Sequence, residues 1–496
     1  MLWTELIKNV KGEIVKGVGD APDILRLSAD SREEQTGSLF FCLDGGEKDG
    51  HAFAEQAVEK GALAVVCNRK LDIPVWQLVV DDTRAAMSEL CAEFYGNPSR
   101  RLKLIGITGT NGKTTTAHML ASILQFSGRN TGIIGTLGVT YNGNTYPSPL
   151  TTPDPIFLQK TLAEMFINGV EYVVMEVSAH ALYYNKVSGL RFSACIFTNF
   201  TQDHLDFFAT MQAYKAAKMR LFDCAVCPVA IVNGDDEVGR EIGKLREKQG
   251  GKTLYYGLDT PSDAFAVISC ETLFFSKSMF NINDKLCRVS LSFTGRHNVY
   301  NALAAAACAV ETGIDVEEAA QGLFAIKGVH GRLQFVTKWQ GANIFVDFAH
   351  TSDGLEKTLD ALREHCKGRL ICLFGCGGNR DKSNRPVMGE TVAKKCDFAV
   401  LTSDNPRYED PLTILGDIEK GYRRFSVKYV VVPERRTAIS YAIDFLQEND
   451  VLLVAGKGGE RYQEIMGIKY PFDDNDIIKT IIGEKTAKNA VYGVEH

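Results

Sequence analysis

Short apolar runs alternate with amphipathic segments along most of the chain. Runs such as Tyr172 to Met175 and Val451 to Ala455 are typical of buried strands. Segments such as Thr83 to Phe94 and the alanine-rich stretch Asn298 to Thr312 repeat their apolar residues at helical spacing. Because strands that alternate with helices form mainly parallel sheets, the pattern predicts an α/β protein.

A glycine-rich segment separates one apolar run from the helix-patterned segment that follows it. Gly109 to Thr115 reads Gly-Thr-Asn-Gly-Lys-Thr-Thr. Backbone N–H groups of such a loop converge on phosphate oxygens, and Lys113 and Thr114 are placed for the β- and γ-phosphates and for Mg²⁺. Counted from Gly106, the spacing G-x5-G-K-T indicates a variant P-loop. The predicted nucleotide-binding residues are Gly109, Thr110, Asn111, Gly112, Lys113, Thr114 and Thr115.

Two breaks in the pattern divide the chain into three blocks. Asn97-Pro98-Ser99 ends the block 1–99, and the alanine-rich helix with a short following helix closes the block 100–330. The block 331–496 holds a third alternation of strands and helices. A chain of 496 residues exceeds one core. We therefore predict a small N-terminal α/β domain, a central P-loop domain with a parallel sheet and a Rossmann-like C-terminal α/β domain.

The composition is that of a globular protein without a broad basic field. Hydrophobic residues make up 45% and the net charge is −6, which argues against a general nucleic-acid or membrane-surface binder. No run approaches the roughly 18 apolar residues that span a bilayer. The N-terminus lacks the basic and then apolar order of a signal peptide. We expect a cytoplasmic protein with no nucleic-acid or membrane partner.

Two polar positions follow apolar runs of the central block. Glu176 ends one run, where its carboxylate would stand beside Thr114 as a Mg²⁺ ligand or form a buried structural pair. His204 follows the next run in a loop, where it would ligate a second metal or simply lie at the polar surface. Both interpretations of each residue remain open from spacing alone, although ligand groups gather at such strand ends.

Further motifs carry a family resemblance. The chain resembles the Mur ligases over nearly its whole length, and it is identified as a member of that family. Ala29-Asp30-Ser31-Arg32 is similar to the UDP-sugar motif of the MurE branch, and Asp404-Asn405-Pro406-Arg407 to its amino-acid motif. Motifs in family order are Gly109 to Thr114, Met175 to His180, Thr198-Asn199, Asp203 to Asp206, Tyr214 to Lys218, Gly295 to Asn301, Gly331-Arg332 and Asp347 to His350.

The resemblance implies an ATP-dependent acid–amino-acid ligase of peptidoglycan precursor synthesis and cell-wall biogenesis, expected to act as a monomer. The D-glutamate carboxylate of UDP-N-acetylmuramoyl-L-Ala-D-Glu would attack the γ-phosphate of ATP, and an amine would capture the acyl phosphate. Such phosphoryl transfer depends on alignment and charge neutralisation. The implied catalytic residues are Lys113, Glu176, His204, Lys218, Asp347 and His350, and the implied metal ligands are Thr114, Glu176, His204 and Lys218.

Lys218 would act only after modification. It lies four residues after Tyr214 in a helix-patterned segment, where a solvated or ion-paired lysine is the ordinary interpretation. The resemblance implies N6-carboxylysine at this position. The carbamate would replace a cation with oxygen ligands, which Mg²⁺ prefers.

Other contacts follow from the resemblance by position. Asn298 and Asn301 open the alanine-rich helix as N-terminal polar groups or contact adenine, as the resemblance implies. Arg332 would meet ATP when the domains close, and Glu460 would accept an ammonium. The implied substrate-binding residues are Ser31, Thr151, Thr152, Ser178, Tyr184, Lys186, Arg380, Asp404, Asn405, Pro406, Arg407, Gly456 and Glu460.

Arg407 and Arg380 favour meso-diaminopimelate as the amine. A guanidinium forms a planar fork that binds a carboxylate through two hydrogen bonds. Diaminopimelate carries a carboxylate at the far end of its side chain, whereas L-lysine carries only an ammonium there. L-Lysine or another amine stays an alternative. Folylpolyglutamate synthase and a non-enzymatic P-loop switch are weaker alternatives, since the first needs no Ser31 block and the second needs an N-K-x-D element.

The chain departs from the family pattern at four positions. Gly459 stands where His is common, Ala179 where Ser is, Lys186 where Arg is and Ser352 where Pro is. Lys186 lacks the bidentate fork of arginine, and Gly459 adds backbone freedom beside Glu460. We expect these changes to affect substrate affinity and amine selectivity, and a paralogue that acts on a related peptide stays an alternative.

Overall fold

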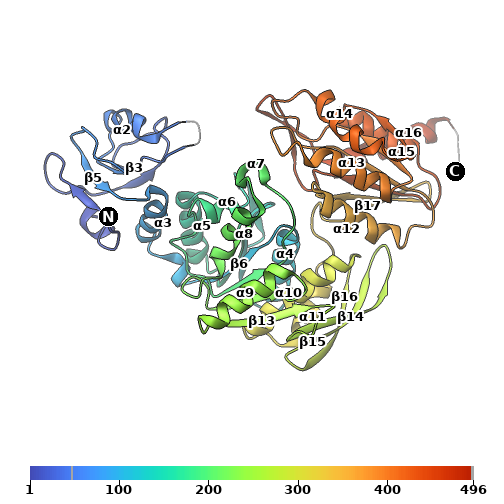
Figure 1. The fold of residues 1–496 in the computed structure, drawn as a ribbon, viewed down its shortest axis with the longest axis horizontal. Coiled ribbons are helices and arrows are strands. Elements are labelled where there is room, and N and C mark those ends of the chain that lie inside the picture. The colour runs from blue at the N-terminus through green and yellow to red at the C-terminus, as the bar shows by residue number, and fades with distance from the viewer. Residues whose placement is uncertain (46–47, 493–496) are drawn as a thin grey trace.

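The computed structural model describes residues 1–45 and 48–492. Figure 1 shows three lobes in chain order, with the blue N-terminal lobe at the left and the orange and red C-terminal lobe at the upper right. Each lobe has its own sheet and its own buried apolar clusters. The predicted three-domain α/β fold class is confirmed, whereas the limits at 99/100 and 330/331 stay predictions.

The N-terminal lobe contains a mixed sheet with the order β1-β5-β4-β3-β2. Asp82 caps helix α3, because its carboxylate accepts hydrogen bonds from the backbone N–H groups of Arg84 and Ala85. Helix α3 also contacts α5 of the central lobe and so joins the two lobes. The elements are α1 (Trp3–Leu6), β1 (Glu13–Val15), β2 (Arg26–Ser28), β3 (Ser38–Phe41), α2 (Ala54–Glu59), β4 (Ala64–Cys67), β5 (Trp76–Val79) and α3 (Thr83–Phe94).

The central lobe is built on a long sheet with the order β16-β15-β14-β13-β12-β11-β6-β10-β7-β8-β9. Its middle strands are parallel, as predicted. The strands are β6 (Lys103–Thr108), β7 (Thr131–Gly135), β8 (Gly138–Tyr141), β9 (Asn144–Tyr146), β10 (Tyr172–Glu176), β11 (Ala194–Phe197), β12 (Val229–Asn233), β13 (Lys252–Gly257), β14 (Ala264–Glu271), β15 (Ser276–Ile282) and β16 (Lys285–Leu291).

Helices cover the central sheet. The alanine-rich α10 packs against α4, since its small buried side chains permit a close approach. The helices are α4 (Lys113–Phe126), α5 (Pro155–Ile167), α6 (Ala179–Tyr183), α7 (Leu205–Phe208), α8 (Met211–Met219), α9 (Glu237–Lys248), α10 (Arg296–Glu311) and α11 (Val316–Ala325).

The edges of the central sheet differ from the simple alternation of strand and helix. Strands β14, β15 and β16 run antiparallel, as do β7, β8 and β9. In β14 and β15 buried and exposed residues alternate, because one face packs on the core while the other faces solvent. A prediction of strands from continuous apolar runs therefore missed β14 and β15.

The C-terminal lobe has a sheet with the order β17-β18-β22-β19-β20-β21, parallel except for β17, and a separate hairpin of β23 and β24. The strands are β17 (Gln334–Trp339), β18 (Ala342–Asp347), β19 (Leu370–Phe374), β20 (Phe398–Leu401), β21 (Lys428–Val431), β22 (Val451–Ala455), β23 (Tyr462–Ile465) and β24 (Ile468–Pro471). The helices are α12 (Ser352–Arg363), α13 (Asn384–Lys395), α14 (Pro411–Tyr422), α15 (Arg435–Asp444) and α16 (Asp474–Tyr492). Across the described residues, no helix is long and apolar enough to cross a membrane.

Candidate active site

A cavity of about 1200 Å³ lies between the central and C-terminal lobes. Its walls come from the P-loop, the ends of β10 and β11, the start of α10 and helix α12. The structure thus gathers residues from distant parts of the chain at the ends of parallel strands. The predicted site residues that line it are Thr110, Asn111, Gly112, Lys113, Thr114, Thr115, Thr151, Thr152, Glu176, Ser178, Tyr184, Lys186, His204, Asn298, Asn301, Arg332, Asp347, His350, Arg380 and Arg407.

The P-loop glycines are required by close contacts. A Cβ on Gly109 would lie 1.8 Å from the Thr198 hydroxyl, and one on Gly112 would lie 2.4 Å from Asn301 Oδ1. Both glycines have positive φ. Lys113 Nζ donates hydrogen bonds of 2.9 Å to the carbonyls of Gly109 and Thr110. Burial lowers the pKa of Lys113, and its ammonium is held within the loop.

Oxygen atoms converge beside the P-loop. Thr114 Oγ1 donates to Glu176 Oε2 at 2.9 Å, and Arg332 donates to Thr114 Oγ1 at 2.9 Å from the C-terminal side. Glu176 Oε1 also accepts from the backbone N–H of Thr136 at 2.8 Å. Thr136 was not predicted as a site residue, since nothing in its local sequence marks it as one. Hard cations prefer such oxygen ligands, so this donor set fits Mg²⁺.

His204 faces the same cavity. It has a positive φ of 56° at the start of α7, and its Nδ1 is buried without a hydrogen-bond partner among the described residues. Burial lowers the pKa of His204 to about 3, which keeps the imidazole neutral at neutral pH. A neutral, unpartnered ring nitrogen is the form that binds a metal.

Lys218 lies outside the cavity lining and contacts the P-loop from helix α8. Its Nζ donates to the Gly109 carbonyl at 2.8 Å and lies 4.5 Å from the centre of the Tyr214 ring. The side chain is 1% exposed. Burial, followed by the nearby charge of Lys113, holds the pKa of Lys218 well below its usual value. A lowered pKa favours the neutral amine, which is the form that reacts with CO₂.

The predicted contacts for the UDP substrate lie in two places. Thr152 Oγ1 donates to the Glu176 carbonyl at 2.9 Å and accepts from the Ser178 N–H at 3.0 Å, beside the cavity. Lys186 pairs with Asp154 at 2.7 Å. Ser31 lies apart in the N-terminal lobe, where its hydroxyl donates to Gln56 at 2.9 Å. A ligand that reached both groups would have to extend across two lobes.

Arg84 contacts both the N-terminal and the central lobe. Its guanidinium is 4.4 Å from the centre of the Tyr184 ring in the central lobe, and it donates to the Asp44 carbonyl at 2.6 Å in the N-terminal lobe. Arg84 was not predicted, since its position in the sequence suggests only a polar residue in the first turn of a helix.

Asn298, Asn301, Asp347 and His350 also line the cavity. The side-chain amide of Asn298 donates to the Thr294 carbonyl at 2.7 Å. The carboxylate of Asp347 accepts from the backbone N–H groups of Leu333 and Ala349 at 2.6 and 2.8 Å. In this structure Asp347 therefore holds the backbone at Leu333, near the start of the C-terminal lobe, by a hydrogen bond. The exposed ring of His350 rests against Phe348 with 4.7 Å between ring centres.

The Asp404 to Arg407 segment meets the segment after β22. Asn405 Nδ2 donates to Glu460 at 2.8 Å, and Lys457 donates to Asn405 Oδ1 at 2.9 Å. A Cβ on Gly456 would lie 2.4 Å from Asp404 Oδ2, so Gly456 permits this approach. Pro406 continues the segment. Unlike Arg407, the residues Asp404, Asn405, Pro406, Gly456 and Glu460 are not among those that line the cavity.

Two further residues of the C-terminal lobe were missed. Asn111 Nδ2 of the P-loop donates to Asp353 Oδ2 of α12 at 2.8 Å. The ammonium of the fully buried Lys457 lies 3.1 Å from Glu460. Asp353 carries no local signal, whereas the Gly-Lys-Gly sequence around Lys457, next to the predicted Gly456, offered one.

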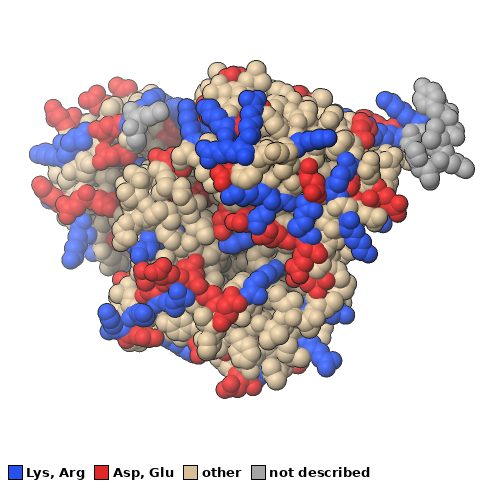
Figure 2. Space-filling model, turned by 45° about the vertical axis from the view of Figure 1, so that its right-hand side comes forward, with Lys and Arg blue, Asp and Glu red and all other residues tan. Residues whose placement is uncertain are grey.

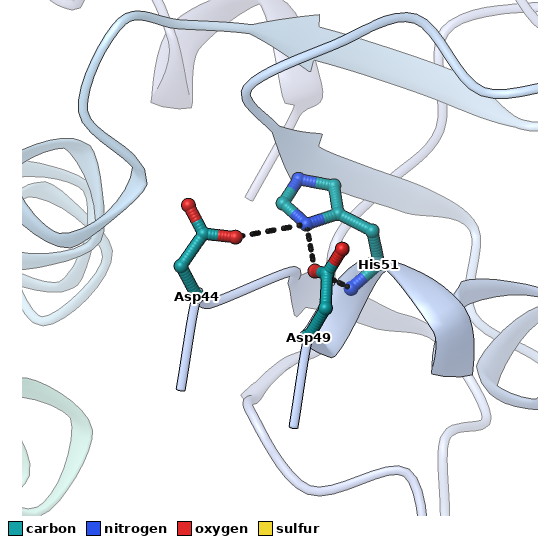
Figure 3. A group of neighbouring side chains, drawn as sticks. All are labelled: Asp44, Asp49 and His51. Carbon is teal, nitrogen blue, oxygen red and sulfur yellow. Dashed lines mark hydrogen bonds and ion pairs between the residues drawn. The ribbon is translucent and has the colours of Figure 1, made fainter. Parts of the chain in front are cut away.

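Three residues of the kinds that bind metal ions lie close together in the N-terminal lobe. Figure 3 shows the side chains of Asp44 and Asp49 turned toward the ring of His51. His51 Nδ1 is 2.5 Å from Asp49 and 3.5 Å from Asp44, while Nε2 accepts from the Asn68 N–H at 3.1 Å. Because Nε2 accepts, the proton of a neutral ring must lie on Nδ1. Both ring nitrogens of His51 are thus engaged in hydrogen bonds within the lobe, and neither is left for a metal ion.

Surface charge is mixed. On the face drawn in Figure 2, acidic and basic side chains are interspersed and do not form one broad basic field. This agrees with the net charge of −6.

Comparisons with known proteins agree with this geometry. Family models match residues 23–95 (Mur ligase family, catalytic domain), 107–309 (Mur ligase middle domain) and 331–458 (Mur ligase, glutamate ligase domain). A relative from Geobacillus thermodenitrificans named UDP-N-acetylmuramoyl-L-alanyl-D-glutamate–2,6-diaminopimelate ligase is 41% identical, with 94% of this chain and 96% of the relative covered.

A relative from Clostridium acetobutylicum, named as ligase 1 of the same kind, is 42% identical over 98% of this chain and 100% of its own length. A solved structure of a protein with that enzyme name has 29% identity and a TM-score of 0.69, with 98% of this chain and 99% of that chain covered. The order of the motifs, the three lobes and these full-length matches agree, and the chain belongs to the Mur ligase family.

Proposed function

We propose that this protein joins meso-diaminopimelate to UDP-N-acetylmuramoyl-L-Ala-D-Glu and converts ATP to ADP and phosphate as the amide bond forms, in peptidoglycan precursor synthesis. The observation that carries the proposal is the single cavity that contains the P-loop residues Lys113 and Thr114 together with Arg380 and Arg407. A nucleotide and an acidic amino acid would therefore bind on facing walls of one space. The relatives named as this ligase support the same substrates.

The chain's own residues would align the reactants and balance charge. Lys113 sits in the P-loop where phosphate oxygens of ATP bind, and Arg332 reaches the same place from the C-terminal lobe. The D-glutamate carboxylate, held near Thr152 and Ser178, would attack the γ-phosphorus as ADP leaves. The amine of the acceptor would then attack the acyl carbon, and phosphate would leave as the amide bond forms.

Mg²⁺ and a modified lysine would complete the site. Thr114 and Glu176 fit one ion through their oxygen atoms, and His204 with carboxylated Lys218 would hold a second. When bound, these ions would neutralise charge on the transferred phosphoryl group. The burial of Lys218 against the Gly109 carbonyl supports the modification, because burial lowers the pKa of Lys218 and so favours the neutral amine that reacts with CO₂. His350 and Asp347 remain proposed residues of the closed cleft.

The remaining contacts are proposed by position. We assign Ser31 to the uridine end and Tyr184 and Lys186 to the muramoyl end of the UDP substrate. Asn298 and Asn301 would contact adenine, and Glu460 would accept the ammonium of the amino acid. The protein would act as a cytoplasmic monomer without nucleic-acid or membrane partners, in keeping with its acidic net charge.

Phosphate release tests the proposal. The assay supplies UDP-N-acetylmuramoyl-L-Ala-D-Glu and Mg-ATP with meso-diaminopimelate or L-lysine in separate reactions, and mass spectrometry identifies the UDP-tripeptide. We expect release and product only with meso-diaminopimelate. Release only with L-lysine would keep the ligase but reject Arg407 as a reader of the second carboxylate. The absence of release with either amine would reject the proposed reaction.

A further inference from the structure

Glu464 holds a position next to the guanidinium that is proposed to bind the acceptor's far carboxylate. It lies on β23, and its Oε2 is 3.3 Å from Arg407 Nε. The two side chains are 20% and 22% exposed, so this ion pair is only partly open to solvent. A carboxylate so close to a carboxylate-binding arginine would either compete with the ligand or hold the arginine in position for it.

The backbone of Glu464 is fixed on both sides by the segment that contains Arg407. Its N–H donates to Asn405 Oδ1 at 2.9 Å, and its carbonyl accepts from the Arg407 N–H at 3.0 Å. The Arg407 carbonyl in turn accepts from the Met466 N–H at 2.7 Å. These bonds do not involve the Glu464 side chain. A substitution of that side chain would therefore leave the contact between β23 and the Arg407 segment in place.

The guanidinium of Arg407 is partly engaged. Nε faces Glu464, and Nη1 donates to the Gly378 carbonyl at 2.6 Å. Among residues 1–45 and 48–488, these are the two acceptors that reach a group with five N–H donors. Arg407 also lines the cavity. Its Nε edge is thus anchored at the cavity wall, while donors of Nη1 and Nη2 are left for a ligand.

We propose that Glu464 is a positioning residue that orients Arg407 to bind the distal carboxylate of the acceptor amino acid. This inference rests on the proposed function. An arginine side chain has several rotatable bonds, and ordering such a side chain upon binding lowers the affinity for the ligand. The ion pair with Glu464 orders the Arg407 side chain when the protein folds, so the guanidinium is already oriented before the acceptor amino acid binds.

Kinetics of Glu464→Ala and Glu464→Gln, each compared with wild type, test the role. We expect Glu464→Ala to raise the KM for meso-diaminopimelate roughly 3- to 10-fold, which is the effect of losing one ordered side chain. The KM values for ATP and the UDP substrate should stay unchanged. Glu464→Gln should recover most of the loss, because its amide oxygen still accepts from Arg407 Nε. Glu448→Ala, an exposed change elsewhere in the same lobe, serves as the control.

A double-mutant cycle with Arg407→Ala separates positioning from a general effect on the fold. If Glu464 acts through Arg407, Glu464→Ala should change nothing further once Arg407 is absent. Additive effects would overturn the inference, and so would a lower KM for Glu464→Ala, because that result means competition with the ligand. A wild-type protein that releases no phosphate with meso-diaminopimelate would instead refute the proposed function itself.

Discussion

Gly459 stands where two lobes approach each other, and a side chain at this position would force neighbouring atoms to move. A Cβ at this position would lie 2.8 Å from Leu137 Cδ2 of the central lobe and 2.9 Å from Cδ2 of His330. The carbonyl oxygen of His330 would be 3.0 Å away. The histidine that the family resemblance leads us to expect at 459 would therefore clash, and His330 already occupies the adjacent space.

We predict that Gly459→Ala destabilises the packing of the two lobes by about 1–3 kcal/mol, the usual effect of overpacking a filled site. The methyl group would push Leu137 away from the segment that carries Glu460 and so disturb the alignment of the two lobes. Because we expect this destabilisation to fall on the approach of the two lobes that binds the acceptor amino acid, the predicted loss in kcat/KM for that amino acid is roughly 5- to 150-fold. Gly459→His should lose more, because its ring is larger.

Steady-state kinetics of Gly459→Ala, Leu137→Ala and the double variant measure the effect. Leu137→Ala removes the nearest clashing atom, so the double variant should recover about 1 kcal/mol relative to the sum of the single changes. Gly483→Ala is the matched control, since a Cβ there meets nothing within 4 Å. Wild-type kinetics for Gly459→Ala, or strict additivity in the cycle, would show that the close approach of the lobes does not limit activity.

Three further predictions concern other contacts. If Lys218 is carboxylated, removal of CO₂ should lower phosphate release, and added bicarbonate should restore it. Activity should fall as the pH drops through the lowered pKa of this amine, because the protonated amine does not react with CO₂. The variant Lys218→Arg should stay inactive even with bicarbonate. Asp353→Ala removes the 2.8 Å bond to Asn111 and should raise the KM for ATP about 10-fold; an ATP titration that matches wild type contradicts this. Arg84→Ala removes the contact at 4.4 Å from Tyr184 and should raise the KM for the UDP substrate about 3-fold with the KM for ATP unchanged; the reverse pattern would refute a role at the UDP substrate.

Local sequence was sufficient where one segment contains its own structural signals. Helix α3 spans Thr83–Phe94, as its apolar spacing predicts, and Val451–Ala455 forms a strand with the predicted bounds. The P-loop likewise follows β6 and opens α4. These features depend on side-chain periodicity and on the backbone preferences of residues that are adjacent in the sequence.

The sequence by itself determined the α/β class, the P-loop and, through its motifs, the family and the amino-acid segment. Only the tertiary structure decided that Asn111 meets Asp353, 242 residues away, and that Glu464 anchors Arg407, 57 residues away. It also decided that Lys218 is buried against Gly109. Such contacts arise when separate sheets and lobes pack together, and no local periodicity specifies which side chains then become neighbours.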